Sequence, residues 1–297
     1  QSYNGDSVSI TLDTELSGQL RQLAKDHSVT MYMLMNGVFS ILLSRYSGQD
    51  DIIIGGNVAN RHYPGTENII GFFVNTLGIR VNLKKDLSFN DLLSQVKATC
   101  LEAYQFQDIP FDYLLSELDV KRDPSRHPIF QVRLMMDQFH QENTNHFQLD
   151  GVDIEPIINT NSAHFDITLS VSELDDQLTF DWNYVSDLFE ASTIKRMSDH
   201  LINICRSVVQ NEHQTLSTIE LLSKKEKHQL LVEWNDTAVD YPREKTIHQL
   251  FEEQVEKSPY NTAIVYEETS LSYRALNKRA NQLARLLIKS GVKVETM

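Results

Sequence analysis

Four short blocks between residues 51 and 131 decide the fold of this chain. In order, they are Asp51-Ile52-Ile53-Ile54-Gly55-Gly56-Asn57-Val58-Ala59-Asn60-Arg61, Ile70-Gly71-Phe72-Phe73-Val74-Asn75-Thr76, Phe106-Gln107-Asp108-Ile109-Pro110-Phe111-Asp112 and Arg122-Asp123-Pro124-Ser125-Arg126-His127-Pro128-Ile129-Phe130-Gln131. The first block holds a short apolar run that ends in two glycines, which is typical of a buried strand. Pro110 in the third block suits the first turn of a short helix through Leu118. The stretch therefore predicts strands that alternate with helices.

The segments around these blocks continue the same pattern. Apolar residues alternate with polar ones on both sides of Asp175 and Asp176, which predicts a hairpin whose strands each bury one face. Capping residues and apolar periodicity predict helices that open near residues 13, 30, 88 and 190. Further strands are expected at residues 7–12, 73–83 and 130–136. Mixed strands and helices indicate a layered α/β domain.

Composition excludes several classes of partner. The 297 residues carry a net charge of −14, which argues against a nucleic-acid surface and against binding to an anionic membrane. Cys100 and Cys205 lie among apolar neighbours and are expected to fill the core of a protein in a reducing compartment. No secretory signal and no apolar run of membrane-spanning length is visible, which favours a cytoplasmic protein. The missing initiator Met and the end at Met297 suggest an excised fragment.

In order and spacing, the four blocks resemble the second half of a condensation domain from a non-ribosomal peptide synthetase. The resemblance covers residues 7–222, about three quarters of the chain. It implies an α/β fold in which a chloramphenicol-acetyltransferase-like lobe combines a mixed sheet with helices. The catalytic motif of that family, HHxxxDG, precedes the blocks and is absent from this chain. The resemblance therefore implies a C-terminal lobe without its N-terminal lobe, with no catalytic residue of its own and inactive in isolation.

The same resemblance implies an activity and its partners. In that family a carrier-bound donor and acceptor enter a tunnel between the two lobes from opposite ends, and the acceptor amine replaces the donor thioester by an amide. Holding two tethered substrates in attack geometry can supply much of the rate. The expected partners are the upstream and downstream peptidyl carrier domains, the missing N-terminal lobe and an adenylation domain. Phosphopantetheine is expected on the carriers, and no cofactor on this chain itself.

Two residues of the first blocks receive roles from the resemblance. Arg61 is expected to support the catalytic loop by pairing with the Asp of HHxxxDG, since guanidinium and carboxylate form a planar bidentate pair. Because that Asp is absent, we expect Arg61 to be unpaired here; the alternative is a solvated loop arginine. Asn75 is expected near the substrate tunnel, where its amide could orient substrate. An Asn that binds neighbouring backbone groups is an equally open interpretation.

The later blocks are expected to have structural roles. Asp108, Pro110 and Phe111 match the HQDxPF block of the family, except that Phe106 replaces its His. We expect Asp108 to cap the short helix. Arg126 and Pro128 fit the family's SRNPLFQV block, which is interpreted as a loop that enters a core strand.

A sequence similar to the catalytic motif occurs later in the chain, but we reject it as a catalytic site. His146 and Asp150 spell HxxxDG together with Gly151, but this copy follows the other blocks, whereas the family motif precedes them. An Asp-Gly pair between apolar runs is also typical of a hairpin turn. The histidines show no metal-ligand spacing, so no metal site is predicted.

The last quarter of the chain carries a second resemblance. Residues 271–276 (LSYRAL) are similar to the first adenylation-domain motif, LTYxEL. The predicted organisation is a condensation C-terminal lobe over residues 1–222, a linker over 223–245 and the truncated start of an adenylation domain over 246–297. ATP and Mg²⁺ would bind only in the missing part of that domain. Competing hypotheses are a non-catalytic docking module for carrier proteins, a related acyltransferase with free acyl donors, and an epimerisation domain.

Overall fold

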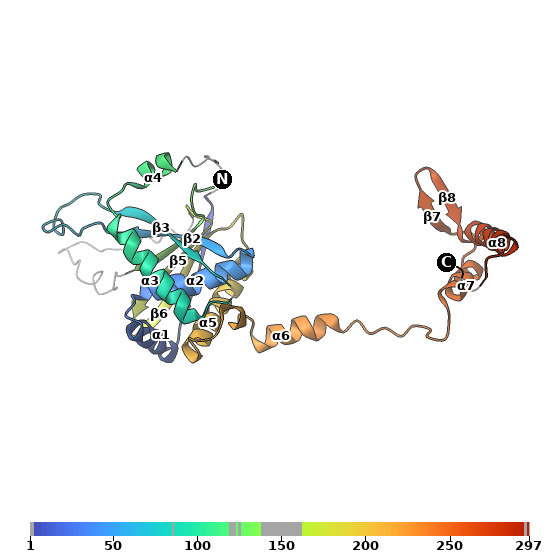
Figure 1. The fold of residues 1–297 in the computed structure, drawn as a ribbon, viewed down its shortest axis with the longest axis horizontal. Coiled ribbons are helices and arrows are strands. Elements are labelled where there is room, and N and C mark those ends of the chain that lie inside the picture. The colour runs from blue at the N-terminus through green and yellow to red at the C-terminus, as the bar shows by residue number, and fades with distance from the viewer. Residues whose placement is uncertain are drawn as a thin grey trace, which may run out of the picture. The chain divides into compact units, whose positions relative to one another are not determined.

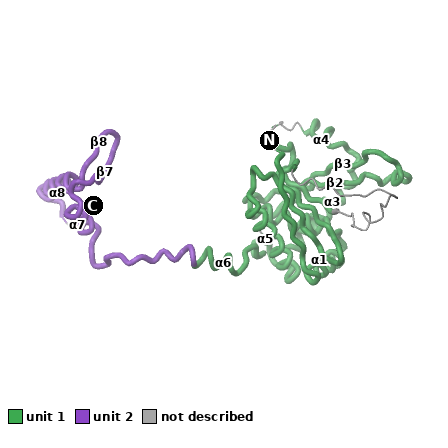
Figure 2. The backbone as a smooth tube through the Cα atoms, turned by 180° about the vertical axis from the view of Figure 1, so that it is seen from behind, with its two compact units in different colours: residues 1–232 green, residues 233–297 purple. Residues whose placement is uncertain are grey.

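The computed structural model describes residues 3–84, 86–118, 123, 126–137, 162–293 and 296. The chain forms two compact units, residues 1–232 and residues 233–297, shown in green and purple in Figure 2. Each unit has its own secondary structure, and unit 1 contains all four sequence blocks.

Unit 1 is built on a six-stranded mixed sheet, as the sequence predicts. Its strand order is β1-β6-β5-β4-β2-β3, with β4 parallel to both of its neighbours and the other pairs antiparallel. The strands are β1 (Gly5–Thr11), β2 (Asp51–Val58), β3 (Asn75–Asn82), β4 (Val132–Asp137), β5 (Ile167–Leu174) and β6 (Gln177–Val185).

The helices of unit 1 other than α6 pack on this sheet (Figure 1), and α2 contacts α3, α5, β2 and β4. The helices of unit 1 are α1 (Thr14–Asp26), α2 (Met31–Ser47), α3 (Phe89–Gln105), α4 (Phe111–Glu117), α5 (Ala191–Gln210) and α6 (Lys224–Leu231), with a short 3₁₀ turn at Leu216–Thr218. Asp13 accepts from the Leu16 amide at 2.7 Å, and Ser88 forms a capping box with Asp91. The predicted helix starts are confirmed.

The core of unit 1 lies between these helices and the sheet. Its largest side chain, Trp182, is fully buried, meets Phe39 edge to face and donates from Nε1 to Ser198 Oγ at 3.0 Å. That hydrogen bond satisfies the indole N–H, which would otherwise be costly to bury. Cys100 and Cys205 are buried free thiols, as expected of core residues.

The predicted hairpin is present as β5 and β6. Asp175 and Asp176 have φ of 48° and 62°, the paired left-handed geometry of a tight two-residue turn. β6 buries alternate residues as predicted, but β5 does not, because Thr168 between Ile167 and Leu169 is also buried. A strand covered on both faces loses its alternation, so the expectation of a single buried face is wrong for β5.

Unit 2 consists of α7 (Ile247–Lys257), β7 (Thr262–Tyr266), β8 (Thr269–Ser272) and α8 (Tyr273–Lys289), with β7 and β8 forming an antiparallel pair. A capping box of Thr246 and Gln249 opens α7. All of residues 236–246 are described, and none belongs to a helix or strand, whereas residues 224–231 of the expected 223–245 linker form α6 in unit 1. No helix among the described residues combines the length and apolar character needed to cross a membrane.

A buried histidine attaches α6 to the body of unit 1. His200 on α5 is 5% exposed; its Nδ1 lies 2.8 Å from the Tyr46 hydroxyl and its Nε2 lies 2.9 Å from Glu226 Oε1. Burial alone would raise the pKa of Glu226, but hydrogen bonds from Ser223 and the contact with His200 outweigh it and lower the pKa to about 2. The Ser223–Glu226 capping box thus joins the start of α6 to α5 and α2.

The lowered pKa of Glu226 predicts a pH-dependent contribution to stability. A depressed carboxyl pKa stabilises the fold above its ordinary value of 4.5, and the contribution is lost as pH falls toward about 2. We expect Glu226→Gln to reduce the free energy of unfolding by about 1–2 kcal/mol at pH 7. Urea unfolding of both proteins should show this difference shrinking below pH 4.5. A difference independent of pH would contradict the prediction. Glu102→Gln is the matched control, because Glu102 is exposed on α3 and forms no hydrogen bond or ion pair with the described residues.

Gly55 is the point where β2 meets β4, and it has no room for a side chain. A Cβ at Gly55 would overlap the ring of Phe130, which is 1% exposed. Gly55 is also the residue through which β2 pairs with Arg133 of β4. The glycine that follows the apolar run of the first block is therefore required by close packing.

We expect Gly55→Ala to destabilise unit 1 by about 1–3 kcal/mol, because the buried Phe130 ring must move away from the new methyl group. Gly18→Ala is the control: Gly18 lies in α1 with nothing within 4 Å of its added Cβ, so it should be neutral or stabilise by about 0.5–1 kcal/mol. Thermal or urea unfolding measures both, and equal effects would contradict this packing account.

Candidate functional site

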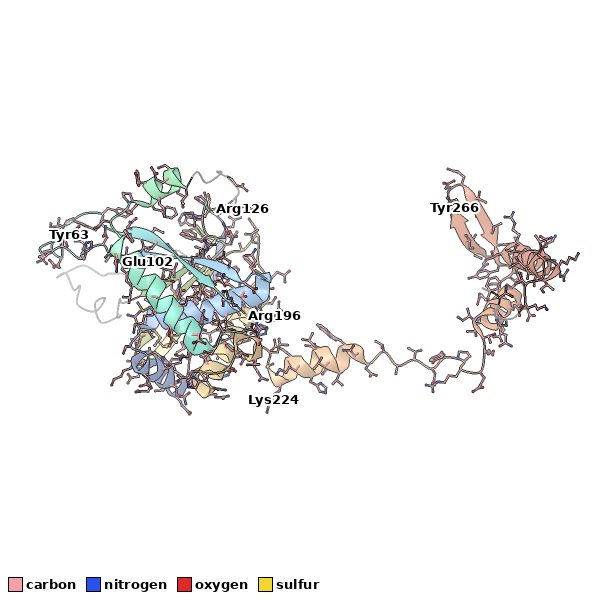
Figure 3. The ribbon with its side chains drawn as sticks, viewed as in Figure 1. Tyr63, Glu102, Arg126, Arg196, Lys224 and Tyr266 are labelled. Atoms are coloured by element: carbon pink, nitrogen blue, oxygen red, sulfur yellow. The ribbon has the colours of Figure 1, made fainter. Side chains whose placement is uncertain are left out.

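The four sequence blocks form a connected series within unit 1. The loop between β2 and β3 runs out from the sheet, and α4 follows α3 nearby (Figure 1). Figure 3 shows Tyr63 on this loop at one side of unit 1 and Arg126 at the other. Side-chain contacts link the first block to the second, the second to the third, and the third to the fourth.

Arg61 holds the loop that follows β2. Its Nη1 donates to the carbonyls of Thr66 and Ile69, the latter at 2.9 Å, and its Nη2 donates to Gly71 O at 3.3 Å. The guanidinium carbon also lies 4.2 Å from the centre of the Phe73 ring, within cation–π range. The expectation that Arg61 has no partner is therefore wrong. Three backbone carbonyls and one ring take the place of the carboxylate, and no ion pair joins Arg61 to the described residues.

Asn75, the first residue of β3, joins the second block to the third. Its Nδ2 donates to the carbonyls of Gln107 and Ile109, both at 2.7 Å, and its Oδ1 accepts from the Thr76 amide at 2.9 Å. The amide thus uses both donor hydrogens on backbone groups. This geometry is what the interpretation of Asn75 as a backbone-binding residue predicts.

Asp108 does not cap α4. The helix begins at Phe111 with Pro110 at the N-cap position and no side-chain capping bond. Asp108 lies two residues before that position, too early to reach the first free amides. Its carboxylate instead accepts from the Tyr63 hydroxyl at 3.0 Å and lies 3.4 Å from His62 Nε2. The hydrogen bond to Asp108 raises the pKa of Tyr63. The prediction that Asp108 caps the short helix is wrong, but its hydrogen bond with Tyr63 is still a structural contact.

Phe111 links the third block to the fourth through a cluster of rings. Its ring centroid lies 5.5 Å from that of His127 and 5.8 Å from that of Phe130, and both of these approach Phe165. Burial lowers the pKa of His127, so the neutral imidazole is favoured in this apolar setting. Such ring pairs add to the stability gained from burial.

Arg126 and Pro128 lie in the loop that precedes β4, as predicted for this block. The Nε of Arg126 donates to Asp123 Oδ2 at 3.0 Å, a pair three residues apart on the exposed part of the loop. Gln131 Nε2 donates back to the His127 carbonyl at 2.8 Å and closes the loop before the strand begins. Pro128 fits here because a loop residue has no need of an amide hydrogen for a sheet.

The rejected pair His146 and Asp150 lies outside the described residues. Within the described ranges, no group of three His, Cys, Asp or Glu side chains is placed to hold a metal ion. Among the described residues, the assembled site consists of side chains that hold loops in place through backbone carbonyls, ring contacts and the Tyr63–Asp108 hydrogen bond. Its chemistry is suited to positioning a substrate or a second lobe.

Sequence reasoning missed His62, Tyr63 and the ring-stacking role of His127. His62 and Tyr63 follow Arg61 directly, but nothing in their spacing indicated that they would meet Asp108, 45 residues further on. For His127, the signal was its place where the SRNPLFQV block of the family has Asn, three residues before Phe130.

We expect Asn75→Ala to loosen α4, because the carbonyls of Gln107 and Ile109 lose their donors. Amide hydrogens of α4 should exchange at least tenfold faster, as measured by hydrogen exchange. Asn57→Ala is the matched control, since Asn57 lies on the adjacent strand with an exposed side chain that makes no hydrogen bond to the described residues. Unchanged exchange in α4 would contradict a clamping role for Asn75.

Solved structures share this fold. A holo four-domain nonribosomal peptide synthetase bound to AMP and glycine matches with a TM-score of 0.76 and 22% identity, over 99% of this chain and 23% of that one. The X-domain from teicoplanin biosynthesis matches with a TM-score of 0.64 and 22% identity, over 73% of this chain and 50% of that one. The sheet and helices of unit 1 are those of a chloramphenicol-acetyltransferase-like lobe, as predicted.

Sequence relatives and a family model identify the chain more closely. Bacitracin synthase 3 of Bacillus licheniformis is 43% identical over 292 residues, 98% of this chain and 4% of that protein. Gramicidin S synthase 2 of Brevibacillus brevis is 38% identical over 298 residues, 100% of this chain and 7% of that protein. The chain thus spans a small part of the length of these relatives. The condensation domain model matches residues 1–231, and the chain belongs to the condensation-domain family of nonribosomal peptide synthetases.

Proposed function

We propose that unit 1 is the C-terminal lobe of a condensation domain that forms an amide bond between a carrier-bound donor and a carrier-bound acceptor. An N-terminal lobe would supply the histidine of HHxxxDG as the base for amine attack. The observation that carries this proposal is the meeting of all four family blocks through Arg61, Asn75 and Phe111. Because HHxxxDG is absent from this sequence, the chain alone is expected to be inactive.

In this proposal Arg61 supports the catalytic loop. Its contacts with three carbonyls use both hydrogens of Nη1 and one of Nη2. The Nε hydrogen and the second Nη2 hydrogen remain for the Asp of HHxxxDG, which could accept both. A guanidinium already fixed by the β2–β3 loop loses little side-chain freedom when it meets that carboxylate.

The other block residues would shape the floor of the substrate tunnel. Asn75 would act there by fixing Gln107 and Ile109, and Asp108 by fixing Tyr63. Phe111 would hold the loop of Arg126 and Pro128 in place through the ring of His127. These contacts position backbone, so their loss would change the shape of the tunnel.

Unit 2 would be the start of an adenylation domain. Its LSYRAL segment forms the end of β8 and the first turn of α8, and the likeness to the four-domain synthetase extends past residue 231. We infer the organisation given by the two resemblances: lobe 1–222, linker 223–245 and truncated adenylation domain 246–297. ATP and Mg²⁺ would bind in the following part of that domain, and phosphopantetheine would be carried by partner carrier domains.

The parent protein would act in the cytoplasm on an assembly line for a peptide product. Support comes from the names of the relatives, which are synthases of bacitracin and of gramicidin S.

The test is peptide formation from donor- and acceptor-loaded carrier proteins. The full 297-residue chain would be assayed alone and with a separately expressed N-terminal lobe. We expect product only when the lobe is present, and a loss of about a hundredfold in rate for Arg61→Ala, because the catalytic loop loses its clamp. Arg80→Ala is the matched control: this exposed arginine forms a bidentate pair with Asp51 on the strand pair β2 and β3.

Product without the N-terminal lobe would overturn the proposal, and equal losses for the Arg61 and Arg80 variants would overturn the role of Arg61. Assembly without product would favour the docking module instead. One observation favours that second function: Ile70 and Phe72 are almost fully exposed on the β2–β3 loop, where an apolar partner surface would cover them.

A further inference from the structure

A cavity of about 490 Å³ opens in unit 1, apart from the Arg61 loop. It lies beside the joint of β2 and β4, whose only shared register pair in the described strands is Gly55 and Arg133. Its walls are formed by the end of α2, the starts of β2 and β5, the segment before β4 and the first turns of α5. Apolar side chains dominate this lining: Ile52, Ile53, Phe130, Val132, Phe189 and Met197.

Most polar groups in the cavity wall already have partners. Asp51 accepts a bidentate pair from Arg80, with distances of 2.6 and 2.9 Å. The Tyr46 hydroxyl lies 2.8 Å from His200 Nδ1, and the Gln131 amide donates to the His127 carbonyl at 2.8 Å. These groups are therefore satisfied by the fold itself.

Asp166 differs from them. Its backbone carbonyl accepts from the Val185 amide, but its carboxylate makes no hydrogen bond or ion pair with any described residue. Burial raises the pKa of Asp166, and the positive charge of Arg126 partly opposes this. Arg126 itself is bonded to Asp123 at 3.0 Å. A half-buried carboxylate beside an apolar wall is stabilised strongly by a cation that enters the cavity.

We propose that this cavity binds a small organic cation, an ammonium group on an apolar body, with the ammonium paired to Asp166. The apolar wall would take the body, and the rings of Phe130 and Phe189 would add attraction for the positive charge. The site is distinct from the Arg61 loop and does not depend on the proposed amide-forming activity.

The charges at the cavity also define what it rejects. The Asp166 carboxylate lines it without a partner among the described residues, so an anionic ligand of the same shape meets like charge. A free amino acid carries a carboxylate, whereas an amine or an aminoacyl group with its carboxyl blocked does not. The selected chemistry is therefore a primary ammonium without an accompanying carboxylate.

The test is an NMR titration of the full 297-residue chain with three probes of equal body: phenethylamine, phenylethanol and phenylpropionate. We expect the Kd of phenethylamine to be at least tenfold lower than that of phenylethanol, and phenylpropionate to bind weakest. Phenylalaninamide is the fourth ligand to be titrated. If its Kd equals that of phenethylamine, the site binds amines in general; if its Kd is lower, the site prefers an aminoacyl group.

Asp166→Asn should remove the preference for the amine over the alcohol. Asp51→Asn is the matched control, because that carboxylate is already neutralised by Arg80, and it should keep the preference within about twofold. Thr193→Phe, which fills the cavity from α5, should abolish binding of every probe. This variant replaces Asp166→Asn as the test of the site if Asp166→Asn does not fold. Equal affinity for amine and alcohol in the unchanged chain, or binding that survives Thr193→Phe, would overturn the proposal.

Discussion

The ring of Phe130 lies against the bare backbone of Gly55, and the rest of unit 1 depends on that contact. The sheet has two parts. One is the β2–β3 pair and the other consists of β1, β6, β5 and β4, and the two parts meet where Gly55 pairs with Arg133. A side chain at position 55 would push the two parts away from each other. The same joint brings the loop before β4 over β2, which places the fourth block beside the third.

The block residues are polar because they donate hydrogen bonds to backbone carbonyls that would otherwise be unpaired. The β2–β3 loop and the segment before α4 expose carbonyls that no regular structure pairs, and a side chain must supply donors for them. Arg61 serves three such carbonyls and Asn75 serves two. One guanidinium and one amide thus fix two loops that a hydrophobic core could not fix, because their apolar residues, such as Phe72, face outward.

Local patterns predicted most elements because caps and turns act within a few residues. Asp13, the Ser88–Asp91 box and the Asp175–Asp176 turn depend only on neighbours, and all are in place. The partners of Arg61 and Asp108 could not be predicted in this way. Asp108 meets Tyr63 across 45 residues, and that meeting is decided by how the loops pack. The family blocks were enough to locate the site, but the contacts within it could be identified only from the folded structure.

The pairing of β1 with β6 has a consequence for how unit 1 folds. Thr11 and Thr179 face each other across this pair although 168 residues separate them in sequence. Closing a loop of that length costs on the order of 5 kcal/mol of chain entropy, and contacts of such separation slow folding. On the ribosome β1 has no strand partner in this sheet until β6 has emerged. Until then both edges of β1 are unpaired among the described strands, so chaperone protection of the nascent chain matters most in this interval.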